Sequence, residues 1–380
     1  MPEWPARPPP GNPPAAAKRS GIGSLTVLAA FLLIGVAGFG SVVLYSAAGG
    51  ALTPWALSHA IRFFVFLVMA IIMARVPENT YARLALPGYI IVLLLLVGVE
   101  LIGAIGGGSQ RWLDLGFIRL QPSELMKLMI VLATARFYAM LPAGEIRNWT
   151  AIWPPLLLLG LPFLLVLVQP DLGTATMIAI GGVTIMFLAG IPLRLFIGAG
   201  ALGAAALPVI YSLLHDYQKK RVLIFLNPEE DALGAGYHIT QSKIAIGSGG
   251  IFGKGFLNGT QSHLDYLPEG HTDFVFATMA EEWGLLGGLA IITAFVLIGR
   301  WGLQVANRAN SRFGRLTAAG LSMTIFYYVM INLLMVMGLA PVVGIPLPMV
   351  SHGGTAMLNV MLCLGILMSI DRHNRVRRGL

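Results

Sequence analysis

Charged residues are scarce in this sequence. Asp, Glu, Lys and Arg make up 11% of its 380 residues, whereas hydrophobic residues make up 56%. Soluble domains carry roughly 25% charged residues, so a chain of this composition cannot build a polar surface around a folded core. A helix needs about 20 apolar residues to cross a bilayer, and the chain has room for about ten such spans. The composition predicts an all-α polytopic membrane protein, a bundle of about ten transmembrane helices.

Cysteine is nearly absent, and the patterns of two common site types are missing. Cys363 is the only cysteine and lies in an apolar run, which excludes an intramolecular disulfide framework. No cluster of His, Cys and Asp has the spacing of a zinc site, and no G-x-S-x-G turn marks a serine nucleophile. The net charge of +8 does not indicate nucleic-acid binding, because most basic residues lie between hydrophobic runs, where they set membrane topology.

The hydrophobic runs set the domain organisation. Residues 1–20 are rich in proline and are predicted to form a disordered tail, and residues 371–380 are predicted to form a basic tail. The domain between them, residues 21–370, contains the predicted spans. These spans cover residues 22–47, 60–75, 84–104, 122–140, 152–168, 173–191, 193–213, 273–299, 316–338 and 354–370.

The basic residues predict the orientation of the bundle. Ten spans put both termini on one side, and that side, together with the even-numbered connections, collects sixteen of the 25 Lys and Arg residues. Because cytoplasmic loops are enriched in Lys and Arg, both tails are expected in the cytoplasm. The long connection at about 214–272 then lies on the outer face, where a loop of this length is typical of a lid or a binding element.

Charged residues within or beside the apolar runs are the first site candidates, because each costs about 2.5–3.5 kcal/mol or more in a membrane. Glu124 and Lys127, in the motif QPSELMK at 121–127, share one helix face. They form either a structural ion pair or a site in which Glu124 orients Lys127 toward a diphosphate. Asp171, in QPDLGT at 169–174, is either a helix N-cap or a functional acid.

Asp273 lies where the long outer connection re-enters the membrane. Because Thr272 already offers a helix cap, Asp273 is predicted to be functional. Small residues on its helix face let another backbone approach closely, or leave a groove below the carboxylate. Glu281 and Glu282, two turns deeper, are predicted to pair with neighbouring helices. The small residues of this face are Ala277, Ala280, Gly284 and Gly287.

Two segments rich in glycine or proline border the predicted spans. The run GSGGIFGKG at 247–255 departs from the nucleotide-binding P-loop pattern and is predicted to be a flexible loop that lies near a polar ligand. The segment at 341–355 is predicted to be a re-entrant or tightly folded outer connection, which is tolerated where it lines a cavity. His352 within it is predicted to be a hydrogen-bonded structural residue.

These motifs, in this order, resemble those of the shape, elongation, division and sporulation (SEDS) family of bacterial membrane proteins, and most of all its rod-shape branch. The likeness covers nearly all of about 22–370. One departure is His352, because the family usually has a tyrosine there. The motifs that carry the likeness are QPSELMK, QPDLGT, HTDFVFA at 271–277, EEWGLLG at 281–287 and PVVGIPLPMVSHGG at 341–354.

The resemblance implies a peptidoglycan glycosyltransferase that polymerises lipid II, an undecaprenyl-diphosphate-linked precursor, on the outer face of the bacterial cytoplasmic (inner) membrane during cell elongation. It implies an essential acid at Asp273, supporting residues at Glu124, Lys127 and Asp171, and an arginine opening the second span at Arg62. It also implies a class B penicillin-binding protein and the elongation machinery as partners, and dependence on a divalent cation, Mg²⁺ or Mn²⁺, whose ligands the sequence does not identify.

The chemistry of these residues suits such a reaction. A β-1,4 link requires deprotonation of the acceptor's 4-hydroxyl, a task for which Asp273 is placed as a general base. Lys127, Arg62 or a bound cation could stabilise the departing diphosphate. The alternative is a flippase for lipid II, which would need polar groups that continue to the cytoplasmic side. A purely structural scaffold for wall-synthesis enzymes would leave Asp273 without a purpose.

Overall fold

The computed structural model describes residues 22–106, 109–114, 119–213, 219, 223–224, 227, 234–264, 266–267 and 269–377. The predicted disordered tail at 1–20 lies outside the described residues, as does most of 214–233. Each predicted apolar run is a helix. These helices are α1 (Ile22–Ala47), α2 (Ala56–Met73), α3 (Glu78–Ile102), α4 (Pro122–Met140), α5 (Trp153–Val168), α6 (Leu172–Ala189), α7 (Leu193–Leu213), α11 (Val275–Arg308), α12 (Arg312–Val336) and α13 (Gly354–Arg377).

The helices confirm the prediction of an all-α polytopic membrane protein. Within the described part of the chain, eight helices are long and apolar enough to cross a membrane, and α7 contains a shorter apolar stretch. Helix α4 contains three charged residues, packs against α3, α6 and α12, and buries most of its side chains. Helix α13 continues to Arg377, so the predicted basic tail begins as helix; Asp371 and Arg375 pair across one of its turns at 2.5 Å.

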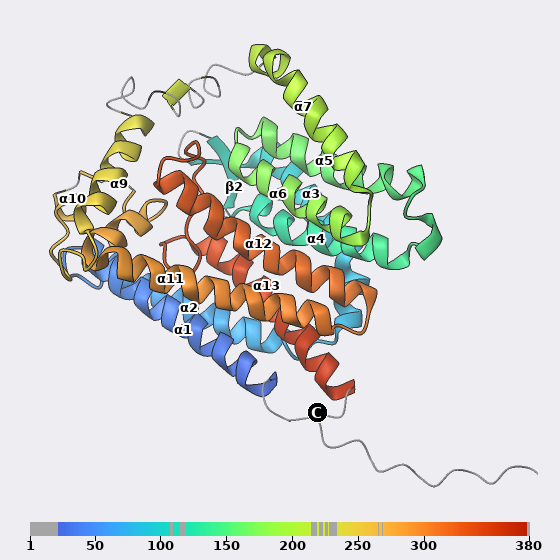
Figure 1. Ribbon diagram of the computed structural model, residues 1–380, viewed down its shortest axis with the longest axis horizontal. Helices are drawn as coiled ribbons and strands as arrows, with labels where there is room; N and C mark the ends of the chain where they lie inside the picture. Colours follow the sequence, from blue (N-terminus) through green and yellow to red (C-terminus); the bar gives the residue numbers. More distant parts are fainter. Residues whose placement is uncertain are drawn as a thin grey trace, which may run out of the picture.

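The connections alternate between the two ends of the bundle. The start of α1 and the end of α13 lie at one end, opposite α9 (Ala235–Gly249) and α10 (Thr260–His263) (Figure 1). Three predicted even-numbered connections meet at the end with the termini. There the Ser369 hydroxyl donates to the Val76 carbonyl at 2.5 Å, Ser311 donates to Glu78, and Arg312 Nη1 donates to the Leu141 carbonyl at 2.8 Å. This pattern is the one expected of a bundle whose two ends of chain share a side.

A small antiparallel sheet joins α3 to α4, which the apolar runs did not predict. It consists of β1 (Ala104–Gly106), β2 (Ser109–Asp114) and β3 (Arg119–Leu120), in the order β1-β2-β3. Strands this short show no clear alternation in the sequence, and pairing with neighbours is what stabilises them. The sheet matters because β2 places Arg111 beside the start of α6.

Helix α11 is interrupted at Gly284, where φ is 61° and ψ is −159°. A segment of the long connection, residues 250–255, hydrogen-bonds with the groups that the interruption exposes. Lys254 N donates to the Glu281 carbonyl at 2.9 Å, and Leu285 N donates to the Gly250 carbonyl at 2.9 Å. The prediction of a flexible glycine-rich loop at 247–255 was therefore wrong, because 247–249 end α9 and the rest pairs with α11.

The same contact decides between the two interpretations of the small residues that follow Asp273. A Cβ atom on Gly249 would lie 2.1 Å from the Ala280 carbonyl oxygen, and one on Gly253 would lie 2.0 Å from the Glu282 carbonyl oxygen. Only glycine allows backbones to approach this closely. Of the two alternatives, the close approach of another backbone is the one observed.

Candidate active site

Asp273 lies in the turn just before α11, at the end of the bundle opposite the chain termini. Its backbone is tied down by Asn332, whose Nδ2 donates to the carbonyls of Asp273 at 2.8 Å and of Ile345 at 2.7 Å. The carboxylate is partly exposed and, among the described residues, makes no hydrogen bond or ion pair. Gly344 packs beside it: a Cβ there would lie 3.3 Å from Asp273 Oδ2. This carboxylate is therefore held in place but left unpartnered.

The surroundings of Asp273 favour its protonated form. Loss of hydration on burial, followed by the negative charges of Glu269 and Asp171, raises the pKa of Asp273 from 3.8 to about 6. A carboxylate with such a pKa is a stronger base than an ordinary one and is still mostly ionised at pH 7. Thr272 does not cap α11 as predicted, because its hydroxyl donates to Glu269 Oε2 at 2.5 Å; Phe274 is the N-cap residue.

Asp171 is the N-cap of α6, one of the two alternatives that the sequence left open. Its Oδ1 accepts from Thr174 N at 3.0 Å, and its Oδ2 lies 3.8 Å from Arg111 Nη1 and 3.4 Å from Gln121 Nε2. Arg111 also donates from Nε to the Gln169 carbonyl at 3.1 Å. Sequence reasoning missed Arg111, because it lies outside the motifs and 60 residues separate it from its partner. Asp171 thus has cationic and amide partners, whereas the Asp273 carboxylate has no such partner among the residues that the structure describes.

Glu124 and Lys127 form an ion pair of 2.6 Å inside the bundle, where Lys127 is 1% exposed. Lys127 Nζ also donates to Tyr328 Oη at 3.0 Å, Tyr328 donates to Glu124 Oε2, and Asn359 Nδ2 donates to Tyr328 Oη at 2.9 Å. We call these four residues the inner network. Sequence reasoning missed Tyr328 and Asn359, which lie in other helices. All contacts of Lys127 are internal, which favours a structural ion pair over contact with a diphosphate.

Arg62 lies near the start of α2, with no carboxylate within ion-pair distance among the described residues. Its Nη1 is 3.2 Å from His352 Nε2, and Ser58 Oγ is 2.9 Å from the same nitrogen. The backbone N–H of His352 donates to the His271 carbonyl at 2.9 Å, and the His271 ring stacks on Trp55 with centroids 4.0 Å apart. The chain around His352 thus links Arg62 to the turn that contains Asp273.

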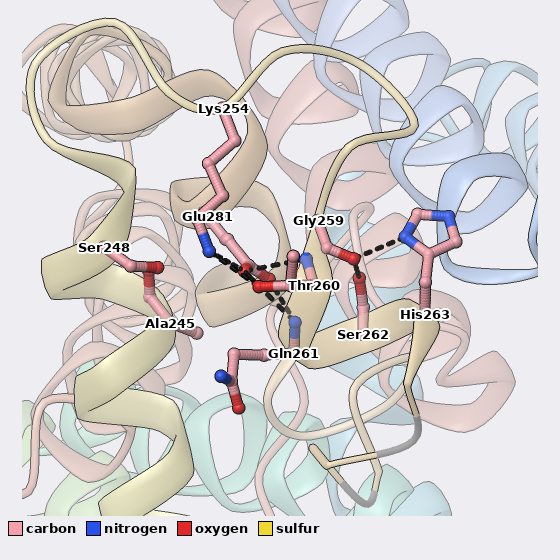
Figure 2. Close-up of polar contacts among 9 residues, drawn as sticks. All are labelled: Ala245, Ser248, Lys254, Gly259, Thr260, Gln261, Ser262, His263 and Glu281. Carbon is pink, nitrogen blue, oxygen red and sulfur yellow. Dashed lines mark hydrogen bonds and ion pairs between the residues drawn. The ribbon is translucent and has the colours of Figure 1, made fainter.

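Glu281 and Glu282 find different kinds of partners. Glu282 Oε1 accepts from Ser46 of α1, as the prediction of pairing with neighbouring helices requires. The hydrogen-bond partners of Glu281 lie shortly before it in the sequence, in the segment 254–261. Figure 2 shows Lys254 and the start of α10 converging on Glu281, which accepts from Lys254 Nζ at 2.6 Å, Thr260 N at 2.9 Å and Gln261 N at 3.1 Å. Glu281 thus also pairs with a neighbouring helix, but this helix belongs to the connection that precedes α11, as does its other partner Lys254.

The described residues do not form a protein-only metal site: no group of three or more His, Cys, Asp or Glu among them could hold a metal ion. Mg²⁺ usually keeps several waters and is bound by one or two carboxylates together with substrate phosphates, so its binding does not require such a group. The expected dependence on Mg²⁺ or Mn²⁺ therefore stays a prediction.

The sequence and the fold were compared with known proteins. The FtsW/RodA/SpoVE family model, described as "Cell cycle protein", matches residues 24–376. The chain is 49% identical over 311 residues to the peptidoglycan glycosyltransferase MrdB of Escherichia coli K12, covering 82% of this chain and 84% of the relative. It is 37% identical over 321 residues to the probable peptidoglycan glycosyltransferase FtsW of Coxiella burnetii, covering 83% of this chain and 85% of that one.

Solved structures agree. A chain from a peptidoglycan synthase complex, studied for how polymerization and crosslinking are coordinated, superposes with a TM-score of 0.79 at 29% identity, covering 94% of this chain and 99% of that one. The rod shape determining protein RodA of Thermus thermophilus superposes with a TM-score of 0.68 at 27% identity, covering 93% and 98%. With its multi-pass helical bundle and its sequence motifs in the same order, this chain belongs to the FtsW/RodA/SpoVE family of cell cycle proteins.

Proposed function

We propose that this protein is a peptidoglycan glycosyltransferase that polymerises lipid II into β-1,4-linked glycan during cell elongation. The observation that carries the proposal is the Asp273 carboxylate, which is fixed through its backbone, has no partner among the described residues and has a pKa raised to about 6. The relatives named as peptidoglycan glycosyltransferases support the same reaction class.

In the proposed reaction Asp273 accepts the proton of the acceptor sugar's 4-hydroxyl. The resulting oxygen forms a bond to C1 of the donor sugar while the bond from C1 to the lipid diphosphate breaks. A positioned general base typically contributes about 10²–10⁴-fold to such a step. The leaving diphosphate takes the bonding electrons, and its growing negative charge is stabilised by a nearby cation. Arg62 is the candidate for that cation, because it has no carboxylate partner among the described residues, whereas Lys127 is buried against Glu124.

The proposed active site faces the periplasm, with both chain termini in the cytoplasm. This orientation rests on the distribution of Lys and Arg. It can be tested with two exposed asparagines at opposite ends of the bundle, Asn258 and Asn148, each changed to Cys in a Cys363→Ser background. An impermeant thiol reagent added to intact spheroplasts should label position 258 and leave position 148 unmodified. The reverse pattern would contradict the orientation.

The proposed partner is a class B penicillin-binding protein that supplies the transpeptidase. The chain similar to this one within a peptidoglycan synthase complex supports that assignment. The direct test of function is to supply the purified protein, together with this partner, with lipid II and to measure glycan polymer. Absence of polymer, combined with transfer of lipid II across the bilayer of proteoliposomes, would favour the flippase alternative. The candidate residues Asp273, Asp171 and Arg62 lie near one another, which supports the glycosyltransferase. Asp171 is close enough to act on the pKa of Asp273, and Arg62 contacts His352, whose backbone is hydrogen-bonded to the turn that contains Asp273.

A further inference from the structure

No carboxylate in the described part of the chain compensates the positive charge of Arg62. Among the described residues its side chain has one polar contact, from Nη1 to His352 Nε2 at 3.2 Å. The charge of an arginine buried against a carboxylate would be neutralised by that partner, as Glu124 neutralises Lys127 at a distance of 2.6 Å. Arg62 instead meets a ring nitrogen, so its position is restrained while its positive charge stays available to an anion.

The contact determines how the His352 ring is protonated. A guanidinium has donors and no acceptor, so His352 Nε2 must accept, and the ring proton of the neutral form must lie on Nδ1. Ser58 Oγ lies 2.9 Å from the same Nε2, but it also lies 2.9 Å from the carbonyls of Pro54 and Trp55, which can take its proton. Burial and the neighbouring positive charge of Arg62 lower the pKa of His352 to about 4, which agrees with a neutral ring at pH 7.

His352 is also held in place through its backbone. Its backbone N–H donates to the His271 carbonyl at 2.9 Å, and the preceding Ser351 hydroxyl accepts from Leu347 N at 2.8 Å. Gly354, at the start of α13, closes the other side of the guanidinium: a Cβ there would lie 3.3 Å from Arg62 Nη1. The Arg62 guanidinium thus lies between the His352 ring and the start of α13.

We propose that His352 is a positioning residue, whose neutral Nε2 orients the Arg62 guanidinium toward the substrate's diphosphate without neutralising it. This proposal rests on the proposed function, because it concerns the cation that stabilises the leaving group. A carboxylate at 352 would orient Arg62 equally well but would cancel the charge that the diphosphate needs.

The test compares four substitutions at 352 in the purified protein with its partner. His352→Phe removes the acceptor, and we expect kcat/KM for lipid II polymerisation to fall about 10- to 100-fold, as for loss of a hydrogen bond to a charged group. His352→Tyr and His352→Gln keep a neutral acceptor and should stay within about threefold of the native protein, since neutral hydrogen bonds differ little in strength. His352→Glu should raise the thermal unfolding temperature relative to His352→Gln and yet lower kcat/KM.

The comparison of His352→Glu with His352→Gln distinguishes a positioning role of His352 from a purely structural one. If His352 were only structural, a substitution that lowers the activity should also lower the stability of the protein. If it is a positioning residue, His352→Glu should be more stable than His352→Gln and yet less active. Equal activity of the Glu and Gln variants would overturn the proposal, and so would full activity of His352→Phe. Because the Glu and Gln side chains are similar in size, the comparison remains informative even where His352→Phe fails to fold.

A double-mutant cycle on ligand binding gives the second readout. The probe is undecaprenyl diphosphate, and its Kd is measured for the native protein, Arg62→Ala, His352→Phe and the double variant. If His352 acts through Arg62, His352→Phe should weaken binding in the native background and cause no further change beside Arg62→Ala. Losses that multiply would overturn the proposal. Normal polymerisation by Arg62→Ala would instead remove Arg62 from the proposed function, and absence of polymer from the native protein would remove that function itself.

Discussion

Charged side chains are paired in the inner network, whereas at the end of the bundle around Asp273 they are left without a partner of opposite charge among the described residues. Inside the bundle, Lys127 and Glu124 pair at 2.6 Å, and Tyr328 and Asn359 add further hydrogen bonds to this pair and to each other. At the end of the bundle, Asp273 has no partner among the described residues and Arg62 meets a neutral ring. The inner charges stabilise one another, whereas the outer ones are restrained but left for a ligand. A charged residue in a membrane protein is therefore a site candidate when its partners leave its charge uncompensated.

The largest effect is expected at Asp273. Asp273→Asn keeps the volume of the side chain but cannot accept the acceptor's proton, so polymer formation should fall by at least about a hundredfold. Removing a desolvated charge beside Glu269 and Asp171 should at the same time raise the unfolding temperature at pH 7.5. The measurements are a lipid II polymerisation assay and a thermal melt, with partner co-purification as the control for folding. Near-normal synthesis by the folded variant would remove Asp273 from the mechanism.

Substitutions in the inner network should change the stability of the protein more than its rate of polymerisation. Lys127→Met leaves Glu124 buried without its cation, which typically costs about 3–5 kcal/mol of stability. The double variant Glu124→Gln/Lys127→Met removes both charges and should recover both folding and polymerisation. The matched control is Lys243→Met, at an exposed lysine, which should change the unfolding temperature little. A double variant that folds but makes no glycan would indicate that Lys127 contacts the substrate. The inner network could then no longer be regarded as purely structural.

A substitution at Glu281 tests whether the segment 250–263 is as firmly held as its contacts indicate. The Glu281 carboxylate accepts from Lys254, Thr260 and Gln261. Glu281→Gln removes the charge from these bonds, each of which is worth about 1.5–3 kcal/mol when charged. Amide hydrogen exchange across 250–263 should become faster, whereas the inner helices should be unaffected. Glu145→Gln, at an exposed glutamate at the other end of the bundle, is the control. Unchanged exchange would show that the backbone pairing with α11 holds this segment by itself.

The smallest expected effect is on the pH dependence of the rate. The pKa of Asp273 is raised to about 6, and the base is the ionised form, so polymerisation should fall by about tenfold for each pH unit below 6. The same shift makes the folded protein bind a proton more readily than the unfolded chain. Its stability should therefore decrease as pH rises from about 4 to 6, and the gain from Asp273→Asn should vanish at the lower pH. A rate that does not change between pH 5 and 7 would contradict the assignment of Asp273 as the general base.

Helix positions and the main candidates were accessible from the sequence. The scarcity of charge and the length of the apolar runs are local properties, and each predicted run is a helix. The N-cap position of Asp171 and the ion pair of Glu124 with Lys127 also depend on residues three apart. The bounds were less accurate where polar residues extend a helix, as at the start of α3 and the end of α13.

Other features could not be read from the sequence, because their partners are far apart along it. Tyr328 contacts Lys127 across 201 residues, and Glu281 fixes a segment about 20 residues before it. The glycines of 247–255 suggested flexibility, whereas the fold uses them for close contact with the interrupted α11. Glycine permits both outcomes, and the neighbouring backbone decides between them.

By itself, the sequence determined that the chain is a helical membrane bundle and which charged residues were candidates, since hydrophobic run length and motif order are local. The tertiary structure decided which of these charges are neutralised. Lys127 and Asp273 are both ionisable residues at the edge of an apolar run, but Lys127 is enclosed between α4 and α12, whereas Asp273 lies just before the start of α11. That difference arises from packing between distant segments, which sets both the local hydration and the partner of each charge.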